Sequence, residues 1–201
     1  MIDIQSVAAM EWAMFDQVQN AGGRASCQNN PKTFMIMRES QFQTWSSAML
    51  DSYAKDLHKA QQQGRNLITE KYGYMMESTH PDEFQHIKDQ LPPITWASLS
   101  KIDDIVLAHI KWERMAHEAY PHLCAKGRPL TADSDSPWVT SFETYLRGEL
   151  KTYSQETLDL YHEYILKCEQ EGRNLALENL HNMVQAYGYS SLEEADAKMN
   201  R

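Results

Sequence analysis

The segment at residues 22–28, Gly-Gly-Arg-Ala-Ser-Cys-Gln, places a cation, a hydroxyl and a thiol between two predicted helices. A cation near a thiol lowers the pKa of the thiol and favours the nucleophilic thiolate. Cys27 is therefore a candidate catalytic nucleophile, and Arg24, Ser26 and Cys27 are candidate ligand-binding residues. A structural alternative stays open, in which the two glycines end the first helix and Arg24 pairs with a helix carboxyl end.

Other polar residues could line a pocket with this loop. Arg38 and Gln41 lie midway along a second predicted helix, and Arg147 and Glu149 lie at a similar place later in the chain. So many arginines in an otherwise acidic protein would suit a small polar or anionic metabolite. Solvated helix surface would explain the same side chains equally well. The candidate ligand-binding set is completed by Arg65, Glu70 and Tyr74. The polar heads of Arg65 and Glu70 could instead stitch the third predicted helix to the other two.

Two Glu-x-x-His spacings match the pattern with which di-iron helical bundles place both side chains on one face. They are Glu83 with His86 and Glu178 with His181. Such matches are expected by chance in a chain with 8 His and many glutamates. We assign no metal site and no cofactor from them. A di-metal carboxylate oxidase is kept as the second alternative function.

Composition limits the classes of function. The formal net charge of −9 and the absence of a Lys/Arg cluster disfavour nucleic-acid binding. No segment approaches the roughly 20 apolar residues that a membrane helix needs, and Glu11 interrupts the apolar start of the chain. Three cysteines without a Cys-x-x-Cys pair fit free thiols in a reducing compartment. We expect a cytoplasmic protein without a membrane or nucleic-acid partner; the sequence leaves its oligomeric state open.

The chain aligns with itself. Residues 33–72 match residues 141–180 without a gap at an offset of 108, and the shared residues include Gly64-Arg65-Asn66-Leu67 with Gly172-Arg173-Asn174-Leu175. Upstream, Trp12 matches Trp112 at an offset of 100. Self-similarity at a fixed offset is typical of a repeat architecture. It predicts a tandem duplication, with repeats at residues 1–90 and 91–201 packed together as one domain.

Each repeat is predicted to contain three helices. The first covers about residues 2–20, the second runs from Pro31 to about Trp45 behind the cap Asn30, and Ser46 caps the third. Apolar residues spaced by three and four carry the third helix past Gly64 to about Met75. A glycine inside a helix costs about 1 kcal/mol relative to alanine. The aligned pair Gly64 and Gly172 therefore predicts that the two third helices cross closely at these glycines.

Several long strings resemble a bacterial family catalogued as domain of unknown function 4125. They are GGRASCQ at 22–28, TFMIMRESQF at 33–42, GRNLITEKYGYMM at 64–76, ETYLRGELKTYS at 143–154 and NMVQAYGYSSLEEA at 182–195. The resemblance spans nearly the whole chain. It implies no established activity, cofactor or catalytic residue.

The sequence thus predicts an all-α fold, a tandem duplication of a three-helix unit packed as one pseudo-twofold helical domain. We expect a pocket between the repeats that binds a small polar or anionic metabolite, with or without catalysis. The first alternative is a protein–protein interaction module, in which the helices present a groove or apolar face to a partner.

Overall fold

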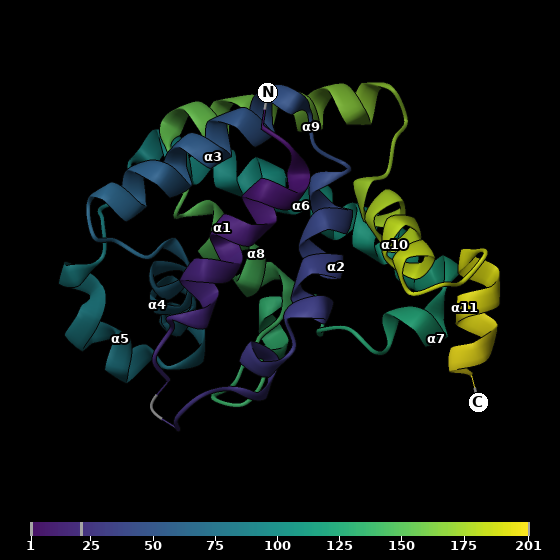
Figure 1. The fold of residues 1–201 in the computed structure, drawn as a ribbon, viewed down its shortest axis with the longest axis horizontal. Helices are drawn as coiled ribbons and strands as arrows, with labels where there is room; N and C mark the ends of the chain where they lie inside the picture. Colours follow the sequence, from purple (N-terminus) through teal and green to yellow (C-terminus); the bar gives the residue numbers. More distant parts are fainter. Residues whose placement is uncertain (1, 21, 201) are drawn as a thin grey trace.

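The computed structural model describes residues 2–20 and 22–200, and all named secondary-structure elements in this part of the chain are helical (Figure 1). The predicted all-α fold class is confirmed. Over the same residues, no helix has the length and apolar character to cross a membrane. The α-helices are α1 Ile4–Asp16, α2 Pro31–Phe42, α3 Ser47–Gln62, α4 Leu67–Thr79, α5 Pro81–Ile87, α6 Trp96–Ala119, α7 Pro121–Cys124, α8 Phe142–Leu150, α9 Gln155–Gln170, α10 Leu175–Ala186 and α11 Leu192–Met199. Three 3-10 turns accompany them: η1 Ser26–Asn29, η2 Lys88–Gln90 and η3 Ala132–Ser134.

The predicted helix starts are confirmed where a side-chain cap signalled them. The Asn30 side chain accepts a hydrogen bond from the backbone N–H of Thr33 at 3.2 Å, and Pro31 occupies the first turn of α2. Ser46 Oγ accepts from the backbone N–H of Met49 at 3.2 Å at the start of α3. These side chains satisfy amide groups that have no partner within the helix, which is why the boundaries can be read locally.

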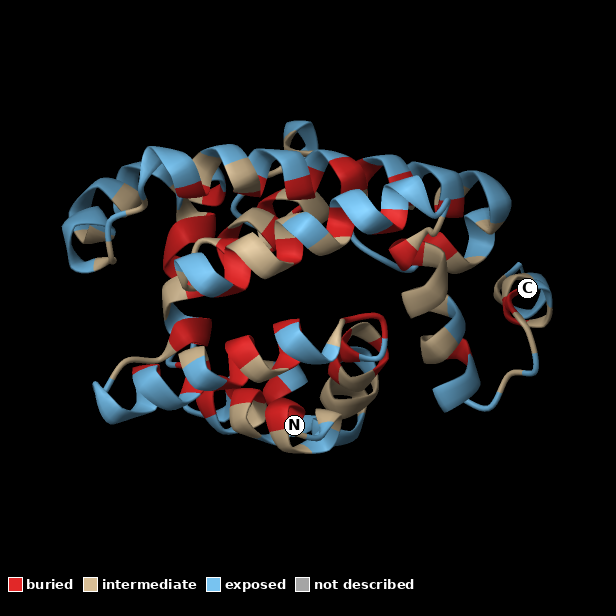
Figure 2. Cartoon of the chain, turned by 90° about the horizontal axis from the view of Figure 1, so that it is seen from above, coloured by how far each residue is buried: buried red, intermediate tan, exposed pale blue. Residues whose placement is uncertain are grey.

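The helices pack around one main core. α3 and α9 run side by side along one edge of the molecule, α4 packs on α8, and α6 packs on α9 (Figure 1). The core takes completely or almost completely buried side chains from both predicted repeats, including Leu57, Ile105 and Ile165. In Figure 2 the buried residues lie on the helix faces that are turned inward. The division into repeats at residues 1–90 and 91–201 stays a prediction.

A small second core lies at the C-terminal end. Val184 of α10 and Leu192 and Ala195 of α11 are buried together there, with Tyr120 and Leu123 packed against them from α7 and the residue before it. Helix α11 therefore stands beside the main body, on α7 and the end of α10, rather than in the main core (Figure 2).

The predicted third helix is two helices, and the prediction of a close crossing at Gly64 is wrong. Gly64 has a φ of +67° and Gly172 a φ of +68°, in the left-handed region that favours glycine. A Cβ atom added at either glycine would meet nothing within 4 Å. The backbone N–H of Arg65 donates to the carbonyl of Ala60 at 2.9 Å, which is the hydrogen bond of a Schellman helix end. Both glycines thus end helices α3 and α9 instead of bringing them together.

The close helix crossing lies at a different glycine. Gly148 lies in the last turn of α8, where an added Cβ would lie 2.7 Å from Met75 Cγ and 2.9 Å from the carbonyl oxygen of Lys71. Real Cβ atoms do not come so close to other heavy atoms. The missing side chain therefore allows α8 to pack directly on α4, and this contact positions the polar groups described next.

Candidate functional site

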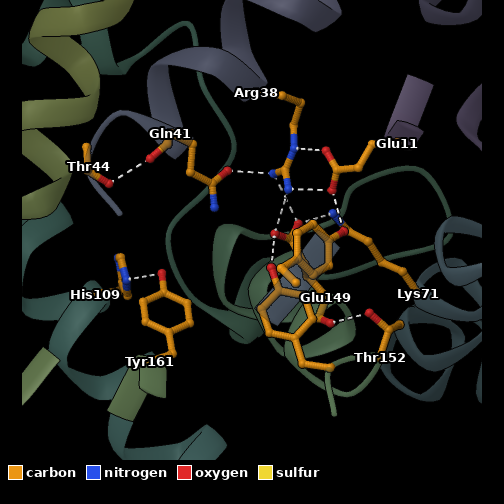
Figure 3. A network of polar contacts seen from close by, with 11 residues as sticks. Glu11, Arg38, Gln41, Thr44, Lys71, His109, Glu149, Thr152 and Tyr161 are labelled. Carbon is orange, nitrogen blue, oxygen red and sulfur yellow. Dashed lines mark hydrogen bonds and ion pairs between the residues drawn. The ribbon is translucent and has the colours of Figure 1, made fainter. Parts of the chain in front are cut away.

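Four charged side chains meet in the centre of the molecule, and they come from α1, α2, α4 and α8. Arg38 Nε and Nη2 donate to the two carboxylate oxygens of Glu11 at 2.5 and 2.7 Å, and Nη2 also donates to Glu149 Oε1 at 3.1 Å. Lys71 Nζ donates to Glu149 Oε2 at 2.5 Å (Figure 3). All four are buried, with 1–7% of each residue exposed. We call Glu11, Arg38, Lys71 and Glu149 the central ion cluster.

Neighbouring polar groups complete the central ion cluster. Tyr53 Oη donates to Glu11 Oε1 at 2.5 Å, Tyr153 Oη donates to Glu149 Oε1 at 2.8 Å, and Arg38 Nη1 donates to Gln41 Oε1 at 2.5 Å. Burial raises the pKa of both tyrosines well above the usual value, so they remain neutral donors. Burial would also raise the pKa of Glu149, but Arg38 and Lys71 outweigh it and hold that pKa well below its usual range.

The central ion cluster balances its own charge, since two carboxylates face two cations. Buried charges are tolerated when they are paired and hydrogen-bonded, and removing one partner leaves an uncompensated charge. The cluster therefore ties four helices together and leaves no charge open to a ligand. The candidates Arg38, Gln41 and Glu149 do come together, as partners of one another.

Sequence reasoning missed Glu11 and Lys71 as members of this cluster. A signal for each was present, because Glu11 interrupts the apolar start of the chain and Lys71 falls at an apolar position of the helical spacing. A charged residue on a buried helix face needs a partner. Nothing in the local sequence says which residue that partner is.

The loop at residues 22–28 folds back onto the end of α1. Arg24 forms an ion pair with Asp16 and donates to the carbonyl of Gln28 at 2.6 Å and to Asn29 Oδ1 at 2.9 Å. The side chain of Gln28 is buried and donates to two carbonyls at the α1 end, those of Phe15 and Val18, at 2.9 and 3.0 Å.

Ser26 and Cys27 of that loop are exposed, and Cys27 is a free thiol. The Arg24 guanidinium is occupied by its pairing with the α1 end, as in the structural alternative weighed for this loop. The role of Cys27 as a nucleophile stays a prediction. The loop lies apart from the central ion cluster, and its most buried polar side chain, Gln28, was not among the candidates.

The remaining candidates lie in the turn between α3 and α4, within α4 and within α8. Arg65 Nε and Nη2 each donate to Glu70 at 2.7 Å, while its Nη1 reaches Gln63 Oε1 at 3.3 Å. Tyr74 Oη donates to the carbonyl of Pro92 at 2.6 Å. Arg147 pairs with Glu143 at 3.0 Å and with Asp103 at 2.5 Å, on the other side of α8 from Glu149.

A surface hollow of about 280 Å³ lies beside the turn between α3 and α4. Its walls come from three places in the sequence: the end of α3 and the following turn, the segment 92–102, and the junction of α8 with α9. Its polar lining includes Asp56, Lys59, Arg65, Lys151, Tyr153 and Gln155. Of the sequence candidates, Arg65 lines this hollow, and Tyr74 lines the hollow next to it. We call the first one the cationic hollow.

The metal alternative gains no geometric support from the described residues. Within residues 2–20 and 22–200, no group of three or more His, Cys, Asp or Glu side chains is placed to hold a metal ion. Glu178 accepts hydrogen bonds from Nε and Nη2 of Arg173, at 2.9 and 2.6 Å. Glu83 and His86 lie in the short helix α5, where neither is buried.

These features define an all-helical protein with a self-paired ionic centre and a cationic hollow on its surface. A family model described as "Protein of unknown function (DUF4125)" matches residues 3–197, so the chain belongs to this family. This confirms the resemblance found in the sequence. No curated protein and no solved structure matches the chain significantly.

Proposed function

We propose that the chain binds a small anionic molecule in the cationic hollow. The observation that carries the proposal is the charge of its lining, in which Lys59, Arg65 and Lys151 surround one recess of a chain with a formal net charge of −9. Concave sites with a few convergent polar groups are typical of small-molecule binding. A local excess of positive charge favours an anion even on an acidic protein.

The acidic group in this lining is already engaged. Asp56 Oδ2 accepts hydrogen bonds from the backbone N–H of Ser154 at 3.0 Å and from Thr157 Oγ1 at 2.7 Å. Its charge therefore serves to join α3 to α9 and is partly satisfied by these donors. Lys59 is exposed, and the described residues supply no ion-pair partner for it.

Arg65 is also placed to hold an anion. Glu70 fixes the guanidinium through Nε and Nη2, which leaves Nη1 with only the long contact to Gln63. An arginine held in this way by a carboxylate is oriented before the ligand arrives, so that less side-chain entropy is lost on binding. Lys151 adds a third cation from the junction of α8 with α9, where its Nζ also pairs with Glu77 at 2.6 Å.

The proposal is tested by titrating the protein with inorganic phosphate while the backbone amides are followed by NMR. We expect the largest shifts near Lys59, Arg65 and Lys151, and binding that weakens as ionic strength rises. Arg65→Met should weaken phosphate binding at least tenfold. Its matched control is Arg173→Met, which removes the equivalent arginine–glutamate pair outside the hollow and should change the affinity less than twofold.

A second pair of variants tests whether the loss of a lysine inside the hollow, rather than the loss of any exposed lysine, weakens phosphate binding. Lys59→Met removes an exposed lysine of the hollow, and Lys167→Met removes the aligned exposed lysine on α9. Only Lys59→Met should weaken phosphate binding. Equal effects of the two variants, or shifts centred away from the hollow, would refute the proposed site.

A further inference from the structure

A second hollow adjoins the cationic hollow and differs from it in chemistry. Its volume is about 500 Å³, and it shares Pro92, Pro93, Ile94 and Lys151 with the cationic hollow as a common wall. Beyond this wall its lining has four apolar or aromatic side chains, Tyr74, Phe84, Leu91 and Leu99, and three charged side chains, Glu77, Lys88 and Asp89. We call it the apolar hollow.

The walls of the apolar hollow are held in place. Tyr74 Oη donates to the carbonyl of Pro92 at 2.6 Å, which ties α4 to the segment between α5 and α6. Leu91 packs so closely on Gly73 that a Cβ added there would lie 3.0 Å from Leu91 Cδ2. A hollow formed before binding requires little reorganisation when a ligand enters.

The apolar side chains in this hollow are only partly covered by the protein. Phe84, Leu91, Ile94 and Leu99 are all partly exposed, and they come from three separate segments that converge. Single exposed apolar residues are ordinary, but several that gather in one recess mark a binding surface.

Lys151 lies where the two hollows meet. Its Nζ pairs with Glu77 at 2.6 Å and lies 5.7 Å from the centroid of the Tyr74 ring. A cation between a polar recess and an apolar recess complements a molecule whose negative charge sits next to an apolar body. The aromatic rings of Tyr74 and Phe84 favour an aromatic body, since rings pack well edge to face or offset.

We infer that the ligand is an aromatic anion, whose charged group lies in the cationic hollow and whose ring lies in the apolar hollow. This inference rests on the proposed function, because it needs the anion to bind at Lys59 and Arg65. It adds the chemical class of the ligand and assigns Phe84, Leu99 and Tyr74 as the residues that select it. An aromatic ring in the apolar hollow contacts side chains such as Phe84 and Leu99, which a bare anion in the cationic hollow does not reach.

The test compares three probes by isothermal titration calorimetry: inorganic phosphate, 1-naphthyl phosphate and uncharged 1-naphthol. We expect 1-naphthyl phosphate to bind at least tenfold more tightly than either of the others. Leu99→Ala should weaken the binding of 1-naphthyl phosphate at least fivefold and change the affinity for phosphate less than twofold. Leu107→Ala is the matched control, since Leu107 is 62% exposed on the same helix and outside both hollows.

The outcomes separate this inference from the proposed function. If phosphate binds but 1-naphthyl phosphate binds no more tightly, or if Leu99→Ala and Leu107→Ala act alike, the aromatic class is wrong and the anion site stands. If neither anion binds, both are wrong. Should Leu99→Ala fail to fold, as judged by its thermal transition, Phe84→Ala makes the same test from the opposite wall. An equal affinity for 1-naphthol would also overturn the inference.

Discussion

The turn between α3 and α4 and the turn between α9 and α10 begin with the same local structure. Each has a glycine with a φ near +67°, and each has an asparagine that caps the next helix. Asn66 also donates to the carbonyl of Met14 at 2.7 Å, and Asn174 to the carbonyl of Trp112 at 3.2 Å. The aligned residues thus make the same kind of contact, each with a helix earlier in the chain, α1 for Asn66 and α6 for Asn174.

The surroundings of the two arginines differ. Arg173 Nη1 donates to Tyr164 Oη at 2.9 Å, and this hydroxyl donates in turn to the carbonyl of Thr44 at 2.8 Å. The residue aligned with Tyr164 is Asp56, which bonds to α9 instead and leaves Arg65 facing the cationic hollow. The second turn is therefore closed by a tyrosine where the first stays open.

The helices that follow the turns differ as well. Lys71 of α4 belongs to the central ion cluster, where it pairs with Glu149. The residue aligned with it in α10 is Asn179, whose buried Oδ1 has no hydrogen-bond partner among the described residues. The comparison teaches that one local motif serves two purposes. Its residues set the turn, and the side chains that pack against it decide whether the turn lines an open hollow or is closed by a tyrosine.

The largest expected difference in the free energy of unfolding is between variants of α4 and α10, the two helices that follow the turns. Lys71→Met should lower the free energy of unfolding by about 3–5 kcal/mol, because Glu149 then keeps only one cation in a buried site. Asn179→Leu should change it by less than about 1 kcal/mol or raise it, since an unsatisfied carbonyl is removed. Urea unfolding measures both. Similar losses for the two variants would abolish the distinction between α4 and α10.

A pH effect of about 3 kcal/mol should come from His109 of α6, which aligns with Ala9 of α1. Burial lowers the pKa of His109 to about 4, and its Nε2 lies 2.8 Å from Tyr161 Oη. Because the folded pKa lies below the unfolded value, the stabilisation is complete above pH 6.5 and is lost as the pH falls toward 4. The free energy of unfolding should therefore fall between pH 6.5 and pH 4, and this fall should be absent in His109→Phe. If His109→Phe shows the same pH dependence of the unfolding free energy, other groups cause that dependence.

Equal losses of about 1–2 kcal/mol are expected for Gly64→Ala and Gly172→Ala, because both must hold a side chain at a left-handed φ. Gly64→Leu should cost little more than Gly64→Ala, since nothing lies within 4 Å of the added Cβ. Thermal and urea unfolding decide this. Gly148→Ala is the contrasting variant and should cost more, because there the neighbouring helix must move.

The smallest effect is expected at the closed turn. Tyr164→Phe removes the hydroxyl between Arg173 and Thr44 and should lower the free energy of unfolding by about 1 kcal/mol. Phosphate binding at the cationic hollow should not change, because Tyr164 lies outside it. A loss of phosphate affinity in this variant would show that the two turns are not independent.

The sequence by itself determined the helical class and the helix starts that depend on a single cap, such as Asn30 and Ser46. The alignment also singled out Arg65 and Glu70, whose residue types recur at Arg173 and Glu178, but the sequence did not pair them with each other. The helical class and the capped starts depend on residues a few positions apart, so that local spacing is enough to predict them.

Only the tertiary structure decided which polar residues meet. Glu11 and Lys71 join Arg38 and Glu149 across as many as 138 positions of sequence, and no local pattern pairs them. The expected single pocket became a buried ionic centre, a loop that caps α1, and two adjoining hollows. Gly64 shows the physical reason most clearly. The apolar spacing of the sequence continues through Gly64, so local reasoning predicts one helix. In the structure the backbone of Gly64 is left-handed and ends α3, and α4 then starts in a new direction and packs on α8.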